Sequence, residues 1–141
     1  MNKILIVEDS TIFRTLLKET LQSRFPSVEI LEAADGGDAM QKIPAHLPDV
    51  IFMDVKLPGE SGLDLTSKIK AKYPNVIVII LTSYDTPEYR EAAGKAKANY
   101  FLAKGSSSKE SILTLVESIL AGRRNPASSR KEGRGDEGAT Q

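Results

Sequence analysis

The sequence contains no cysteine, which excludes disulfide bonds, thiol nucleophiles and cysteine-based metal sites. Its longest apolar run, residues 76–81, is six residues long, whereas a membrane-spanning helix needs roughly 20 residues. The single histidine, His46, lies between two prolines and has no partner at metal-ligand spacing, so we interpret it as a surface residue in a loop. These absences exclude a transmembrane helix and a catalytic role for cysteine or histidine.

An excess of charge of one sign is also lacking, because 19 basic residues balance 19 acidic residues. We therefore expect no direct binding to nucleic acid. Residues 1–9 carry one lysine and then run into acids, unlike a secretory signal with a small-residue cleavage site. We accordingly expect a cytoplasmic protein without membrane contact.

The 141 residues have room for one ordinary domain, and the composition changes abruptly after Gly122. Residues 123–141 contain no Leu, Ile, Val, Phe or Tyr, so they cannot bury enough apolar surface to offset the entropy lost on ordering. We predict a folded domain over residues 1–122 and a disordered polar tail over residues 123–141.

Short aliphatic runs alternate with helical patterns along the first 122 residues. The predicted strands are residues 4–7, 28–33, 50–53, 76–81 and 100–103, the second of them near a sheet edge. The predicted helices are residues 10–24, 35–43, 63–72, 86–97 and 107–121. Right-handed crossovers place such helices on both faces of a parallel sheet. The pattern predicts an α/β fold with a doubly wound, five-stranded parallel sheet.

Single residues set several helix boundaries. Pro44 is expected to end the second helix. The last helix is expected to begin with a capping box between Ser107 and Glu110 and to stop at Gly122.

Two helices also carry apolar stripes at spacings of three and four. In the first helix the stripe is Phe13, Leu16, Leu17 and Leu21, and in the last it is Ile112, Leu115, Val116 and Ile119. Leu113 and Leu120 lie on a neighbouring face of the last helix, where we expect partial exposure. A homodimer formed through this helix is therefore a candidate assembly.

Polar residues follow the predicted strands where each strand ends. They are Glu8 and Asp9, Asp54, Thr82 and Ser83, and Lys104. In parallel α/β folds this edge of the sheet is the ligand site. Three carboxylates there repel one another unless a cation lies among them, and all-oxygen ligands suit Mg²⁺. The hydroxyl of Thr82 and the ammonium of Lys104 suit the binding of a transferred phosphoryl group.

Four motifs in this order resemble those of the receiver domain of two-component response regulators, which has a flavodoxin-like (βα)5 fold. They are ILIVED at residues 4–9, DVIFMDVKLPGESG at 49–62, VIILTS at 78–83 and YFLAK at 100–104. The resemblance covers residues 2–121. It implies that Asp54 accepts a phosphoryl group from a sensor histidine kinase or a histidine phosphotransfer protein.

The resemblance also implies a ligand set for Mg²⁺. Glu8, Asp9 and Asp54 would hold the ion together with the main-chain carbonyl of Lys56. The side chains of Lys56 and Tyr84 stand at positions that overhang the phosphoryl group in this family.

Further residues match positions that respond to phosphorylation in this family. Thr82 and Lys104 would bind phosphoryl oxygens, and Phe101 would act with Thr82 as a conformational switch. Lys97 stands where the family usually has glycine, so we expect a positive φ at a residue that carries a side chain.

The expected function is a single-domain response regulator in two-component phosphorelay signalling. Phosphorylation would change the surface that a downstream target protein binds. The chain would catalyse only its own Mg²⁺-dependent phosphorylation and autodephosphorylation at Asp54. Thr11 and Arg14 open the first helix beside the acids, where a kinase could dock.

Two alternatives keep the receiver fold. Gly105 follows Lys104, as in receivers attached to DNA-binding output domains, so the chain could be the receiver part of a transcriptional regulator without its output domain. A phosphorylation-independent pseudo-receiver would only bind partners, but it would lack the acceptor or the lysine, and both are present.

Two other function classes share parts of the pattern. A Mg²⁺-dependent phosphatase with an aspartate nucleophile usually has a second aspartate two residues later, where this chain has Lys56. A flavin mononucleotide carrier of the same fold needs an acid-free phosphate loop after the first strand, where Glu8 and Asp9 would repel the phosphate. The sequence disfavours both classes.

Overall fold

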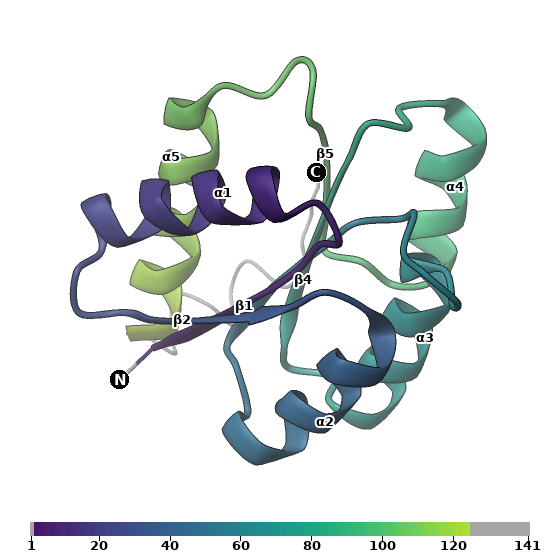
Figure 1. Ribbon diagram of the computed structural model, residues 1–141, viewed down its shortest axis with the longest axis horizontal. Coiled ribbons are helices and arrows are strands. Elements are labelled where there is room, and N and C mark those ends of the chain that lie inside the picture. The colour runs from purple at the N-terminus through teal and green to yellow at the C-terminus, as the bar shows by residue number, and fades with distance from the viewer. Residues whose placement is uncertain (1, 125–141) are drawn as a thin grey trace. The chain divides into compact units, whose positions relative to one another are not determined.

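The computed structural model describes residues 2–124, in which strands and helices alternate along the chain (Figure 1). The strands are β1 (Lys3–Val7), β2 (Glu29–Ala33), β3 (Val50–Met53), β4 (Ile77–Thr82) and β5 (Tyr100–Ala103). The helices are α1 (Thr11–Arg24), α2 (Gly36–His46), α3 (Gly62–Lys72), α4 (Pro87–Lys95) and α5 (Lys109–Arg124). The chain up to Ser107 forms one compact unit, and α5 belongs to a second.

The five strands form one parallel sheet in the order β2-β1-β3-β4-β5, which confirms the predicted fold class and the edge position of β2. Because β1 pairs with both β2 and β3, the direction in which the chain winds reverses at β1. This reversal is the topological switch point at which open α/β sheets bind ligands. The register pairs Val7 with Met53, so the residues that follow β1 and β3 are neighbours.

The core of the first unit explains why its central strands are rich in aliphatic residues. Alternate strand residues face α2, α3 and α4, and together they form one buried cluster: Leu5, Val7, Ile51, Met53, Val78 and Ile80 from the strands, with Ala39, Ile43, Leu65, Ile69 and Ala93 from the helices. On the central strands β1 and β3, the intervening residues Ile4, Ile6 and Phe52 are equally buried. Strands covered on both faces need apolar residues at every position. This packing fixes the strand ends that carry the polar residues.

The second helix continues past Pro44, so the prediction that Pro44 ends it is wrong. Proline removes one hydrogen bond, but α2 closes another turn, in which Leu47 N donates to Ile43 O at 2.7 Å. The helix ends at His46 instead, because Leu47 adopts a left-handed conformation with φ 50°. His46 is therefore the last helical residue and not a loop residue.

The last helix differs from its prediction at both ends. Ser108, and not Ser107, caps the helix, because its hydroxyl accepts a hydrogen bond from Ser111 N at 3.1 Å. Gly122 lies inside α5, which continues through Arg124, since one glycine lowers helix propensity by only about 1 kcal/mol. Residues 125–141, the rest of the predicted tail, lie outside the described residues.

Two apolar faces also differ from their predictions. On α5, Leu113 and Leu120 are buried rather than partly exposed, because the buried face is wide and includes Ile112, Val116 and Ile119 as well. On α1, Leu16 is 52% exposed, since Leu17 and Leu21 define the buried face and Leu16 lies beside it. The exposure of Leu113 and Leu120 therefore no longer supports a homodimer through α5.

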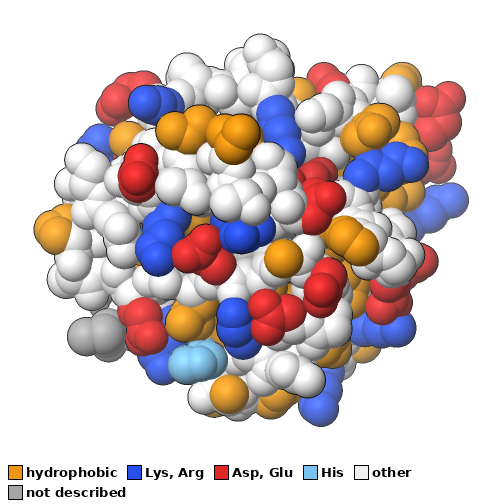
Figure 2. All heavy atoms as spheres, viewed as in Figure 1, with side chains coloured by type: hydrophobic (Ala, Val, Ile, Leu, Met, Phe, Trp, Pro, Cys, Tyr) orange, Lys and Arg blue, Asp and Glu red, His pale blue; other side chains and the backbone are white. Residues whose placement is uncertain are grey.

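Lys97 has a φ of 70°, which confirms the expected left-handed residue after α4. No helix in the described part of the chain has the length and apolar character needed to cross a membrane. On the face drawn in Figure 2, basic and acidic side chains are interspersed, in keeping with the balanced composition.

Candidate functional site

Three carboxylates gather at the carboxyl end of the sheet. One ligand oxygen from each of Glu8, Asp9 and Asp54 lies within 4.8 Å of the others. Glu8 and Asp54 are buried, with 3% and 6% of their surface exposed, whereas Asp9 is exposed. The structure thus brings the three predicted metal-binding acids together.

The sheet holds Glu8 and Asp54 in place through their main chains. Glu8 N donates to Ala33 O at 3.0 Å, and Asp54 N donates to Val7 O at 3.1 Å. Both residues therefore continue the parallel hydrogen-bond ladder by one position beyond their strands. Ser10, the N-cap of α1, donates from its own N–H to Glu8 Oε2 at 3.0 Å.

Lys104 supplies the positive charge of the site. Its Nζ lies 2.7 Å from Glu8 Oε1 and 3.4 Å from Asp54 Oδ2, and it stands 4.2 Å from the ring centroid of Phe13. Lys104 N donates to Thr82 O at 2.8 Å, so the residue continues β5 along the ladder. This ammonium contacts two of the three clustered carboxylates, which leaves the cluster short of positive charge.

The environment of Glu8 works against its ionisation. Burial raises the pKa of Glu8 above its ordinary value, the neighbouring charge of Asp54 raises this pKa further, and the hydrogen bonds from Lys104 and Ser10 lower it. A divalent cation beside Glu8 would favour the ionised form.

Asp54 carries an unused hydrogen-bond acceptor. Its Oδ1 is buried and has no hydrogen-bond partner among the described residues. Buried carboxylate oxygens rarely stay without a partner. The donor set fits a hard divalent cation, because carboxylate oxygens are the ligands that Mg²⁺ prefers.

The remaining predicted residues surround this cluster. Thr82 is fully buried at the end of β4, and its Oγ1 accepts a hydrogen bond from Tyr84 N at 3.3 Å, whereas Ser83 is exposed. The Lys56 ammonium lies 5.2 Å from the ring centroid of Tyr84 and 6.0 Å from that of Tyr89. The predicted role of the Lys56 carbonyl as a ligand stays a prediction.

Phe101 lies half-buried on β5, against the core that α2, α3 and α4 share with the sheet. The guanidinium of Arg90 stands 4.7 Å from the centroid of its ring. Arg90 Nε also lies 2.6 Å from Asp85 Oδ1 in the loop before α4. This ion pair holds the guanidinium beside the ring of Phe101, the predicted switch residue.

The family model described as response regulator receiver domain matches residues 4–117. The chain belongs to this family. The receiver is 37% identical over 121 residues to oxygen regulatory protein NreC of Staphylococcus haemolyticus (strain JCSC1435), a match that covers 85% of this chain and 55% of that protein. The chain thus spans about half the length of the curated relatives it matches.

Solved structures agree with this assignment. A CheY-like receiver domain protein from Methanospirillum hungatei JF-1 superposes with a TM-score of 0.81 at 25% identity, covering 89% of this receiver and 98% of that chain. A LuxR-family DNA-binding response regulator from Staphylococcus aureus gives a TM-score of 0.77 at 27% identity, covering 84% and 98%. The chain is a receiver domain of the two-component response regulators, as the motifs predicted.

Sequence reasoning missed three contacts at the receiver's site. Phe13 was assigned only to the core, yet its ring lies beside the ammonium of Lys104. Arg14 was considered for docking, but its side chain is 15% exposed and donates to Glu8 O at 2.6 Å. A Cβ on Gly62 would lie 1.8 Å from Asp54 O. Only the Gly62 contact had a local signal, a glycine at the point where the segment after β3 enters α3.

Proposed function

We propose that the receiver accepts a phosphoryl group on Asp54 from the phosphohistidine of a sensor kinase or a phosphotransfer protein. A carboxylate oxygen of Asp54 would attack phosphorus while the phosphorus–nitrogen bond breaks, and the histidine nitrogen would leave with the bonding electron pair. The observation that carries the proposal is the buried Asp54 carboxylate, which has an unpartnered oxygen and lies beside Glu8, Asp9 and Lys104.

The acids around Asp54 would hold Mg²⁺, with the Lys56 carbonyl as a further ligand. Bound Mg²⁺ supplies positive charge to the phosphoryl oxygens and so lowers the barrier to attack by an anionic carboxylate. The sheet fixes the main chains of Glu8 and Asp54, so binding needs no backbone rearrangement at these two residues.

Lys104 and Thr82 would bind the phosphoryl group from the other side of Asp54. The Lys104 ammonium already neutralises part of the acidic cluster and would exchange one carboxylate for a phosphoryl oxygen. The Thr82 hydroxyl now accepts from Tyr84 N, and turning it toward phosphate would release that loop. Phe101 would respond to this change by turning inward, which alters the surface of α4 and β5 that a target protein binds.

The relatives favour a second candidate for the output of this switch. NreC is named an oxygen regulatory protein, the Staphylococcus aureus structure is a DNA-binding response regulator, and the chain spans about half of NreC. The receiver would then control a DNA-binding domain in a longer protein, while the described residues would not themselves contact nucleic acid.

The test is intact mass after incubation with acetyl phosphate, with and without Mg²⁺. Wild-type protein and Asp64→Asn, which changes an exposed aspartate on α3, should gain one phosphoryl group only when Mg²⁺ is present. Asp54→Asn should gain none. A phosphoryl adduct on Asp54→Asn, or no adduct on folded wild-type protein, contradicts the assignment of Asp54.

A further inference from the structure

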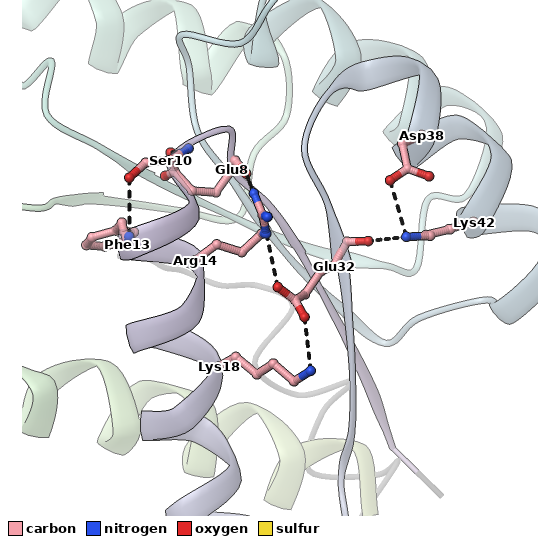
Figure 3. Close-up of polar contacts among 8 residues, drawn as sticks. All are labelled: Glu8, Ser10, Phe13, Arg14, Lys18, Glu32, Asp38 and Lys42. Carbon is pink, nitrogen blue, oxygen red and sulfur yellow. Dashed lines mark hydrogen bonds and ion pairs between the residues drawn. The ribbon is translucent and has the colours of Figure 1, made fainter.

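Arg14 joins the acidic site to a network of charged residues between α1, β2 and α2 (Figure 3). Its Nη1 donates to the main-chain oxygen of Glu8 at 2.6 Å, and its Nε donates to Glu32 Oε1 at 3.0 Å. The side chain is only 15% exposed. Arg14 therefore bridges a backbone atom of the site and a carboxylate on the neighbouring strand.

The Glu8 carbonyl belongs to the peptide group that connects Glu8 to Asp9. A peptide group is planar, so the direction of its oxygen fixes the backbone rotation on either side. All the other hydrogen-bonding atoms of Glu8 are also bound: its N by Ala33, its Oε1 by Lys104 and its Oε2 by Ser10. The bond from Arg14 completes this set, and it is the one that orients the link to the exposed Asp9.

Glu32 keeps the guanidinium of Arg14 in place. Its Oε1 accepts from Arg14, its Oε2 accepts from Lys18 Nζ at 2.9 Å, and its main-chain oxygen accepts from Lys42 Nζ. Lys42 Nζ also lies 3.2 Å from Asp38 Oδ2 on α2. Glu32 is thus held from α1 and from α2, so Arg14 has a fixed anchor rather than a mobile surface partner.

We propose that Arg14, anchored by Glu32, is a positioning residue that sets the Glu8–Asp9 peptide and with it the direction in which these two acids face a divalent cation. The inference rests on the proposed function, because that function supplies the cation. Arg14 would act through the backbone of Glu8, because its side-chain hydrogen bonds go to Glu8 O and Glu32 Oε1 and not to a carboxylate of the acidic cluster.

Removal of Arg14 would change the metal affinity in opposite directions under a positioning role and under a purely electrostatic role. Removing the positive charge of Arg14 lowers the repulsion of a nearby cation, so Coulomb's law alone predicts tighter binding. Loss of a positioning contact predicts weaker binding, roughly 10-fold for a residue that orients a ligand. The two explanations therefore predict opposite shifts.

The experiment measures Mn²⁺ binding to the full chain by electron paramagnetic resonance, with Mn²⁺ as the probe for the Mg²⁺ site. Arg14→Gln should bind roughly 10-fold more weakly than wild type. Lys18→Gln is the matched control, because it removes a positive charge from the same Glu32 carboxylate without touching Glu8. It should change the affinity by less than about 2-fold.

Self-phosphorylation by acetyl phosphate gives a second readout. In Arg14→Gln the Mg²⁺ concentration for half-maximal rate should rise by the same factor, while the rate at saturating Mg²⁺ stays near that of wild type. Arg14→Lys, which keeps the charge but cannot donate from two separate nitrogens, should show an intermediate loss and serves if Arg14→Gln does not fold.

The outcomes distinguish the two proposals. The positioning role is overturned if folded Arg14→Gln binds Mn²⁺ as tightly as wild type or more tightly. If Arg14→Gln does not fold, wild-type affinity in Arg14→Lys overturns it instead. Either result leaves the proposed function intact. Failure of wild-type protein to bind Mn²⁺ overturns both. Weaker binding in Arg14→Gln beside a near-normal Lys18→Gln supports the positioning role.

Discussion

The two halves of the site are built with different forces. In the acidic half (Glu8, Asp9, Arg14, Asp54 and Lys104), directed hydrogen bonds hold Glu8 at its N, O, Oε1 and Oε2 atoms. In the aromatic half (Lys56, Tyr84, Tyr89, Arg90 and Phe101), cations stand 4.7 to 6.0 Å from ring centroids. Tyr84 is 44% exposed there, whereas Glu8 is 3% exposed.

The two kinds of contact suit two different tasks, fixed ligand geometry in one half and conformational rearrangement in the other. Buried, directed hydrogen bonds keep ligands in one geometry, which a metal or phosphoryl site needs. Exposed cation–π contacts contribute about 0.5 to 1 kcal/mol each and tolerate several arrangements. The acidic half is therefore prepared for binding, and the aromatic half can rearrange at little cost in free energy.

Gly62→Ala should produce the largest effect, because Gly62 packs directly against the main chain of Asp54 in the acidic half. The added Cβ would lie 1.8 Å from Asp54 O, so the backbone after β3 must move. We expect the free energy of unfolding in urea to fall by more than about 4 kcal/mol. Gly94→Ala on α4 is the control: apart from the adjoining residues and backbone of its own helix, no described atom lies within 4 Å of the new Cβ, and stability should rise by up to about 1 kcal/mol.

Lys104→Met should be the next largest change, because it leaves Glu8 and Asp54 buried without their cation. The metal-free protein should lose about 3 kcal/mol at pH 7 in urea unfolding. The loss should shrink toward pH 5, because burial raises the pKa of Glu8 and protonation removes the uncompensated charge. Lys95→Met, at an exposed pair with Glu91, should cost at most a few tenths of a kcal/mol, and an equal loss there would refute the explanation.

Glu32→Gln tests, through the pH dependence of stability, the contribution of the carboxylate that anchors Arg14. Hydrogen bonds from Lys18 and Arg14 hold the pKa of Glu32 below its ordinary value of 4.5. A lowered pKa in the folded state means that the stability from Glu32 is present above about pH 4.5 and is lost as pH falls further. The difference in melting temperature between wild type and Glu32→Gln should be largest at pH 7 and should disappear at low pH. A difference that grows on acidification would contradict this sign.

Arg90→Gln should have the smallest effect on folding, because Arg90 and its partner Asp85 are exposed. We expect a change in unfolding free energy of less than about 1 kcal/mol. The ring of Phe101 should nevertheless become more mobile, which relaxation measurements on its aromatic carbons would detect. Lys95→Gln, on the same helix but away from Phe101, should leave these signals unchanged; unchanged signals in both variants would show that Arg90 does not restrain the ring.

The sequence predicted the strands and the acidic cluster because both follow from local pattern. Aliphatic runs mark strands covered on both faces, and parallel strands bring their carboxyl ends to one edge, so Glu8 and Asp54 had to meet. The contact of Arg14 with Glu8 O depends on how α1 lies against β2, which spacing alone does not encode. Pro44 was misjudged because a missing N–H weakens a helix turn without always ending the helix.

The residues of the site are also far apart in the sequence. Lys104 and Glu8 are 96 positions apart, and Lys104 follows β5, which lies at the edge of the sheet. β5 pairs with one neighbouring strand only, and contacts between residues far apart in the sequence are slow to form during folding. A receiver whose β5 has detached keeps its acids but loses their ammonium group, so only a chain with the complete sheet carries the whole site. Competence for phosphoryl transfer would then report that the whole sheet has formed.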